Sequence, residues 1–405
     1  MAMRGFTVYS SKRPALPDRR QPEPKSLFAK LYRHLPALLT AGFFAFGLVL
    51  LAYRTAPVLI PSSDSDSIEA PFASAPPLTL LYAWLAQLPL RQAAVVWSLG
   101  TLAAYGAAIW LAVRLAYKGK RRLPRLFIAS IALLLPPFHE ELRHFGPGVL
   151  TLALFLLSFY GLERNRAKAA GIPLGIALAF APGASAILLW FFRRGKKDCV
   201  AAALLTMAAA ILATAVFAGY RVYEDYFALL ASVFPDNFVW NALAGSGLSP
   251  FQTRFAYCFY LLAFALVVAV LPDLRRSTGS RFDFLIGAMC ALWFSPMQGS
   301  PDRLLLFIGY AIVVGIVVEK YAESAAPLRL AAGERWGAAC LLLSAALLAI
   351  PAGTASDASA PVLAMASVHL LSIPILLLSR KLGKTQSRRT IPLKDYRLRK
   401  SRHGG

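Results

Sequence analysis

The chain has 405 residues, of which 58% are hydrophobic and 16% charged, whereas a soluble domain is about half apolar and about a quarter charged. This imbalance argues against a soluble enzyme and indicates an integral membrane protein. The formal net charge of +23 would also suit a nucleic-acid-binding protein. However, the basic residues flank apolar segments and fill the two tails, as topology and an anionic leaflet require. We therefore expect membrane lipids, and no nucleic acid, as partners.

Apolar stretches recur along the chain, and roughly 20 residues suffice to cross a hydrocarbon core of about 30 Å. The predicted spans are 35–54, 92–116, 126–138, 147–163, 198–218, 255–274, 282–296, 304–320, 336–351 and 361–379. The first 34 residues lack a short basic region followed by a cleavage site, so the first span is predicted to be an uncleaved signal anchor. The sequence thus predicts an all-α polytopic membrane protein with about ten transmembrane helices.

Three further segments are predicted to be helical without crossing the membrane. Residues 169–192 are apolar, are broken by Pro182-Gly183, and lie between basic clusters at 164–168 and 193–197. This pattern predicts a re-entrant hairpin of two half-helices. In the loop 55–91, the piece LTLLYAWLAQLPL is too short to span comfortably, and the loop 219–254 is rich in aromatic residues. Both suit helices that lie in the membrane interface.

The distribution of Lys and Arg predicts the orientation. With the N-terminus inside, 37 of the 43 basic residues fall on cytoplasmic segments, as the positive-inside rule requires. We expect a basic cytoplasmic tail at 1–34, a transmembrane domain at 35–379 and a second basic cytoplasmic tail at 380–405, in the inner (plasma) membrane. The composition of the tails favours disorder.

Candidate chemistry lies on the predicted outer face, which holds ten of the twenty acidic residues and the remaining arginines. Carboxylates and arginines there could hold a phosphorylated lipid head group; alternatively, they are solvated loop charges.

The segment HEELRH at 139–144 does not match the zinc motif H-E-x-x-H, because its histidines are five residues apart. We expect no metal and no cofactor, and the four cysteines imply no disulfide framework.

The order of several weak motifs resembles the polyprenol-phosphate-mannose-dependent mannosyltransferases of glycosyltransferase family 87, which have the GT-C fold. The resemblance covers roughly residues 70–320. The first motif is PFASAPPLTLLYAWLAQLPLRQAAVVWSLG, with Pro76, Pro77, Leu90, Ala93 and Trp97 in place. GPGVLTLALFLLS at 146 resembles the family's corner that opens a span, and AGIPLGIALAFAPGASAILLWFFRRGKK at 170 resembles its Pro-rich hairpin closed by a basic cluster. FVWNALAGSGLSPFQTR and Ser295-Pro296 follow in the same order as in the family.

The resemblance implies a GT-C-like bundle and an inverting transferase that uses a polyprenyl-phosphate sugar on the outer face. A carboxylate would take the acceptor proton, and cations would stabilise the departing phosphate. The catalytic candidates in the first outer loop are Asp64 and Asp66. The candidates for binding the substrate and its phosphate are Arg254, Arg303, Asn241 and Glu69.

The chain departs from the family pattern at polar positions. The first outer loop is short and lacks D-F-x-x-Y, Pro147 replaces the glutamine of the corner, and Phe180 or Ala181 replaces a basic residue of the hairpin. The histidine pair expected after Ser-Pro is absent from MQGSPDR. These departures leave open a catalytically inactive GT-C-like subunit that binds partner membrane subunits. A transporter also stays open because of the broken hairpin, although ionisable residues are scarce in the spans.

Overall fold

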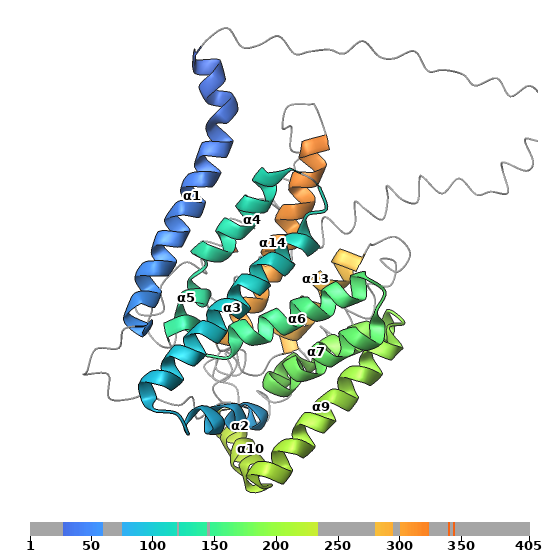
Figure 1. The fold of residues 1–405 in the computed structure, drawn as a ribbon. Helices are drawn as coiled ribbons and strands as arrows, with labels where there is room; N and C mark the ends of the chain where they lie inside the picture. The colour runs from blue at the N-terminus through green and yellow to red at the C-terminus, as the bar shows by residue number, and fades with distance from the viewer. Residues whose placement is uncertain are drawn as a thin grey trace, which may run out of the picture.

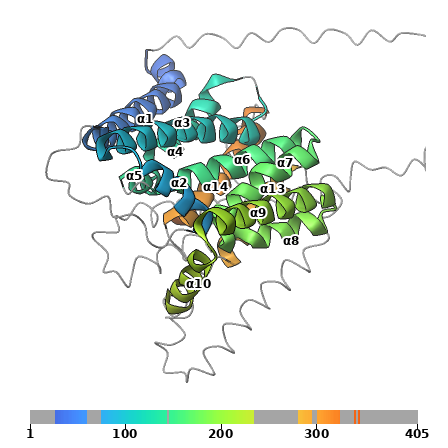
Figure 2. The same ribbon diagram turned by 60° about the horizontal axis from the view of Figure 1, so that its bottom comes forward.

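The computed structural model describes residues 27–59, 75–119, 121–143, 146–233, 280–294, 300–323, 339–340 and 343–344. Within these residues all regular structure is helical, as predicted, and the helices form one bundle with α1 at its edge (Figures 1 and 2). The helices are α1 (Leu27–Leu59), α2 (Pro76–Leu85), α3 (Leu90–Ala116), α4 (Arg122–Leu134), α5 (Pro136–Arg143), α6 (Gly148–Glu163), α7 (Ala167–Phe180), the 3-10 turn η1 (Pro182–Ser185), α8 (Ala186–Arg193), α9 (Lys197–Ala218), α10 (Arg221–Val233), α13 (Ser280–Phe294) and α14 (Ser300–Glu323).

The long apolar helices follow the predicted spans. Helices α3 and α9 are long and apolar enough to cross a membrane, over Arg91–Ala116 and Lys197–Ala218. Helix α1 contains the predicted span 35–54 and begins before it. The predicted spans 255–274 and 361–379 lie outside the described residues, and 336–351 is described only at 339–340 and 343–344. The number of transmembrane helices therefore stays a prediction.

The predicted span 126–138 is wrong as a single helix. The chain leaves the helical conformation at Leu135, whose ψ is 120°, and α5 then begins at Pro136. Proline disfavours helical dihedral angles in the residue before it and cannot donate a backbone hydrogen bond. The pair Pro136-Pro137 therefore ends α4 after Leu134. Helix α4, with 13 residues, is only about 20 Å long at 1.5 Å per residue.

The predicted break at Pro182-Gly183 is confirmed, since η1 separates α7 from α8. Two glycines show how the hairpin is arranged. A Cβ added to Gly171 would lie 2.5 Å from the Cys199 carbonyl oxygen, and one added to Gly175 would collide with the Ala203 carbonyl oxygen. A step of four residues along α7, from Gly171 to Gly175, thus matches a step of four residues along α9, from Cys199 to Ala203, and both steps run in the same direction. Because α7 and α9 are parallel, α8 must return to the side on which α7 begins.

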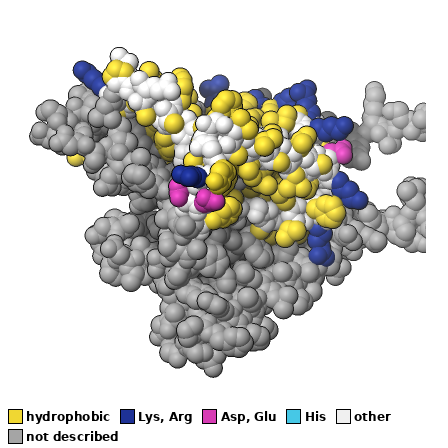
Figure 3. All heavy atoms as spheres, turned by 90° about the horizontal axis from the view of Figure 1, so that it is seen from below, with side chains coloured by type: hydrophobic (Ala, Val, Ile, Leu, Met, Phe, Trp, Pro, Cys, Tyr) yellow, Lys and Arg dark blue, Asp and Glu magenta, His cyan; other side chains and the backbone are white. Residues whose placement is uncertain are grey.

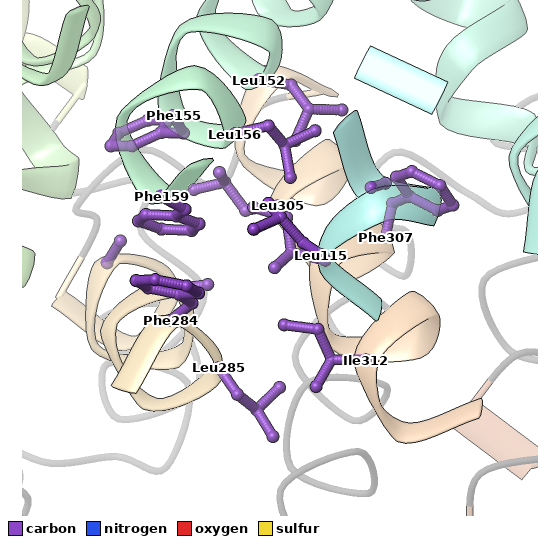
Figure 4. Close-up of a cluster of buried hydrophobic side chains, with 14 of the residues drawn as sticks. Leu115, Leu152, Phe155, Leu156, Phe159, Phe284, Leu285, Leu305, Phe307 and Ile312 are labelled. Atoms are coloured by element: carbon purple, nitrogen blue, oxygen red, sulfur yellow. The ribbon is translucent and has the colours of Figure 1, made fainter. Parts of the chain in front are cut away.

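The core lies where α3, α6, α13 and α14 meet. Phe159 of α6 stacks on Phe284 of α13 with ring centroids 4.8 Å apart (Figure 4). Phe159 also meets Phe191 of α8 edge-on, with ring centroids 6.0 Å apart. All three rings are almost completely buried. Aromatic burial and favourable ring geometry together hold the second part of the hairpin against α6 and α13.

Ion pairs place several helix ends on one side of the bundle. Lys118, after α3, pairs with Glu163 at the end of α6 at 2.5 Å, and Arg194, after α8, pairs with Asp283 at the start of α13. We call this side the basic face, defined by the turns after α3, α6 and α8. The starts of α6 and α14 lie at the opposite end, which we call the far face, together with α5 and the end of α9.

Candidate functional site

The corner between α5 and α6 is the best-defined polar feature of the far face. Glu141 is 1% exposed, and its Oε2 accepts a hydrogen bond from the backbone N–H of Gly148 at 2.8 Å. Gly148 is the first residue of α6, and no side chain of the N-cap residue Pro147 caps that helix. A carboxylate at a helix N-terminus satisfies a backbone donor that has no partner in the helix and interacts favourably with the helix dipole. Glu141 therefore fixes the direction in which the chain enters α6.

This arrangement also explains the glycine before the corner. A Cβ on Gly146 would collide with the Glu141 carboxylate, and the N–H of Gly146 donates to the Glu141 carbonyl oxygen at 3.0 Å. The interpretation of Glu141 as a solvated loop charge is therefore wrong, because the residue is buried and its Oε2 accepts a hydrogen bond from a backbone N–H. The sequence carried no signal for this contact, since the donor is the backbone N–H of Gly148.

Helix α5 is anchored in the bundle by neighbouring side chains. Phe138 is fully buried, with its ring centroid 4.7 Å from that of Tyr105 on α3 and 5.4 Å from that of Phe307 on α14. The Nε2 of His139 lies 2.9 Å from the Leu133 carbonyl oxygen. His139 thus holds the bend between α4 and α5.

The contact between Phe138 and Phe307 also locates one predicted site residue. Arg303 lies in the first turn of α14, one turn before Phe307. Its backbone is therefore at the end of α14 that lies beside α5, on the same face as the corner held by Glu141. The structure brings this predicted phosphate-binding position and the corner of the resemblance to one end of the bundle.

The segment with the paired prolines forms the predicted short helix. Pro76 and Pro77 occupy the first two positions of α2, where a missing N–H costs nothing. Tyr82 of α2 lies against Trp97 of α3, with ring centroids 5.1 Å apart. Helix α2 contacts α7 and α9, so it packs against the hairpin side of the bundle. Two features of the resemblance, the proline pair and Trp97, thus meet at one helix pair.

The other predicted site residues lie outside the described residues: Asp64, Asp66, Glu69, Asn241 and Arg254. Their roles stay predictions. The segment 60–74 joins α1 to α2, and the segment 234–279 joins α10 to α13. Both segments start and end at described helices, and α2 and α10 contact one another.

The profile of glycosyltransferase family 87 matches residues 72–297, which is more than half of the 405 residues. The match begins just before α2 and ends just after α13. It therefore includes the hairpin, the α5–α6 corner and the contact between Tyr82 and Trp97. No curated protein matches the chain. No solved structure matches it either.

Proposed function

Because the chain belongs to glycosyltransferase family 87, a family of membrane glycosyltransferases, we propose that it transfers a mannose-like sugar from a polyprenyl-phosphate donor. The acceptor is a hydroxyl group on the extracytoplasmic side, which we assign to the far face. In this proposal the protein has the GT-C fold and lies in the inner (plasma) membrane. Its tails, 1–34 and 380–405, are cytoplasmic. The family match over 72–297 carries the proposal.

The proposed reaction is a single displacement with inversion. The acceptor oxygen attacks the anomeric carbon as the bond from that carbon to the phosphate oxygen breaks. Asp64 or Asp66 takes the proton of the acceptor hydroxyl, and the polyprenyl phosphate leaves with the electron pair of the broken bond. Arg254 and Arg303 stabilise the negative charge on the departing phosphate, while Glu69 and Asn241 bind the substrates.

Two observations on described residues support the far face as the site. The start of α14, which carries Arg303, lies beside α5 and the buried Glu141. The hairpin and α2 are held together at the same end through the contacts of α2 with α7 and α9. Rigid helix ends are suitable supports for groups that must be held in a fixed geometry.

The experiment is a transfer assay on membranes that contain the wild type or the double variant Asp64→Ala/Asp66→Ala, with radiolabelled polyprenyl-phosphate mannose and a series of hydroxyl acceptors. Loss of a general base is expected to lower the rate by about 100-fold or more. The matched control is Asp198→Ala, which removes an exposed carboxylate at the start of α9 on the basic face.

The control should keep the wild-type rate, and all three proteins should unfold at the same temperature. Equal transfer by the wild type and the double variant contradicts the assignment of the base. Absence of transfer from polyprenyl-phosphate mannose to every acceptor tested contradicts the proposed activity. Co-purification of a partner membrane subunit would then identify the chain as an inactive GT-C-like subunit of a complex.

A further inference from the structure

The turn between α6 and α7 carries three exposed basic residues, Arg164, Arg166 and Lys168. We call them the basic turn cluster. The turn is tight, with Asn165 at a φ of 59°, and the Arg166 N–H donates to the Gly161 carbonyl oxygen at 2.9 Å. The backbone positions of the three residues are therefore set by an ordered turn at the junction of two helices.

The acidic residue of this turn is already paired elsewhere. Glu163, 19% exposed, binds Lys118 from the turn after α3 at 2.5 Å. Within the described residues, no ion pair joins a carboxylate to the basic turn cluster. Helix α7 also has no acidic residue in its first turn and no side-chain cap. The positive end of its dipole therefore adds to the charge of the cluster.

Other basic residues lie nearby, on the start of α9. Gly171, in the second turn of α7, touches Cys199 in the first turn of α9, which places the two helix starts side by side. Lys196 and Lys197 precede and begin α9. The basic turn cluster and these lysines thus concentrate positive charge on one part of the basic face. In the view from below, basic side chains stand along the right-hand edge, beyond a broad apolar surface (Figure 3).

One arginine of the cluster is oriented to receive an anion at its N–H edge. The guanidinium carbon of Arg164 lies 4.7 Å from the centroid of the Tyr160 ring. Stacking engages the flat face of the guanidinium and leaves its N–H edge for a second partner. A phosphate group, with several acceptor oxygens, matches that edge in geometry and charge.

Exposed apolar side chains also lie on the same two helices, farther from the turn. Ile172 lies one turn after Lys168 on α7 and is 52% exposed, and Leu157 lies two turns before Arg164 on α6 and is 46% exposed. Residues one turn apart share a face of a helix. The surface therefore carries positive charge at the turn and apolar side chains farther along the two helices. Such a surface suits an amphiphile better than a soluble anion.

We propose that the basic turn cluster binds the phosphate of an anionic phospholipid, whose acyl chains lie along Leu157 and Ile172. The site is on the basic face, at the opposite end of the bundle from the proposed transfer site. It depends on the membrane location of the protein and not on its proposed activity. The lipid would hold together the α6–α7 turn and the start of α9.

The test uses the full chain in detergent, titrated with phosphatidylglycerol or with phosphatidylcholine of the same acyl chains, and counts retained lipids by native mass spectrometry. The variant Arg164→Gln/Arg166→Gln/Lys168→Gln should bind phosphatidylglycerol roughly 100-fold more weakly, from about 1 kcal/mol for each basic group. The matched control, Arg399→Gln/Lys400→Gln/Arg402→Gln, removes the same charge from the C-terminal tail and should bind like the wild type.

The conservative variant Arg164→Lys/Arg166→Lys keeps the charge and should retain binding within about tenfold, since it loses only the planar fork of arginine. Equal binding of phosphatidylcholine, or equal weakening by the tail variant, would overturn the proposal. So would displacement of the lipid by glycerol phosphate at equal concentration, because the acyl chains would then contribute nothing.

Discussion

Replacing Gly175 with alanine tests the parallel packing of α7 and α9. A Cβ at this position would collide with the Ala203 carbonyl oxygen and would lie 2.7 Å from the Cβ of Thr206. Neither neighbour is the end of a flexible side chain, so the two helices must separate. Overpacking of this kind costs about 1–3 kcal/mol, against a gain of at most about 1 kcal/mol from replacing glycine by alanine within a helix. We expect net destabilisation of about 1–2 kcal/mol.

The assay is thermal unfolding of the purified protein in a mild detergent, followed by tryptophan fluorescence. The control is Gly106→Ala on α3, where a Cβ would meet nothing within 4 Å, so the same substitution should be neutral or stabilising. If both variants unfold at the wild-type temperature, or if Gly175→Ala is the more stable of the two, the close contact between α7 and α9 is wrong.

Three further predictions concern the stability of described contacts and use the same unfolding assay. Glu141→Ala should lower stability by about 2 kcal/mol, because the N–H of Gly148 loses a charged acceptor, whereas Glu141→Gln should cost less; equal losses would show that the hydrogen bond contributes nothing. Phe159→Ala should cost about 3 kcal/mol or more by leaving a cavity, and an unchanged unfolding temperature would contradict its place in the core. Arg194→Met should cost about 3 kcal/mol because it leaves Asp283 buried without its ion pair, and adding Asp283→Asn should recover part of that loss; additive losses would argue against the pair.

The sequence predicted those parts of the fold that depend on local residue types. The break at Pro182-Gly183 follows from the properties of proline. The short helix predicted in LTLLYAWLAQLPL is α2, which begins two residues earlier, at the proline pair. The pair Pro136-Pro137 likewise indicates a bend at Leu135. The prediction of one continuous span over 126–138 is wrong because the apolar run there continues through these prolines. The pair Gly171 and Gly175, four residues apart, is a known pattern for close helix contact and could have predicted the packing of α7.

The candidate site was less accessible from sequence. The burial of Glu141 depends on where the backbone of Gly148 lies in space, and no residue pattern encodes that position. The expectation for Arg303 depends on its place beside a family motif, whereas its proximity to α5 depends on the long-range contact between Phe138 and Phe307. The expectations for the remaining site residues depend only on their order along the chain.

The return of α8 has a consequence for how the chain is inserted during synthesis. A segment that enters and leaves on the same side does not change the parity of membrane crossings, so the hairpin of α7 and α8 is neutral with respect to topology. Reporter enzymes fused after residue 165 and after residue 195 should therefore report the same compartment. Loss or gain of such a hairpin would leave every later helix in its original orientation. The number of helices in this part of the chain can therefore change without inverting the membrane topology of the rest.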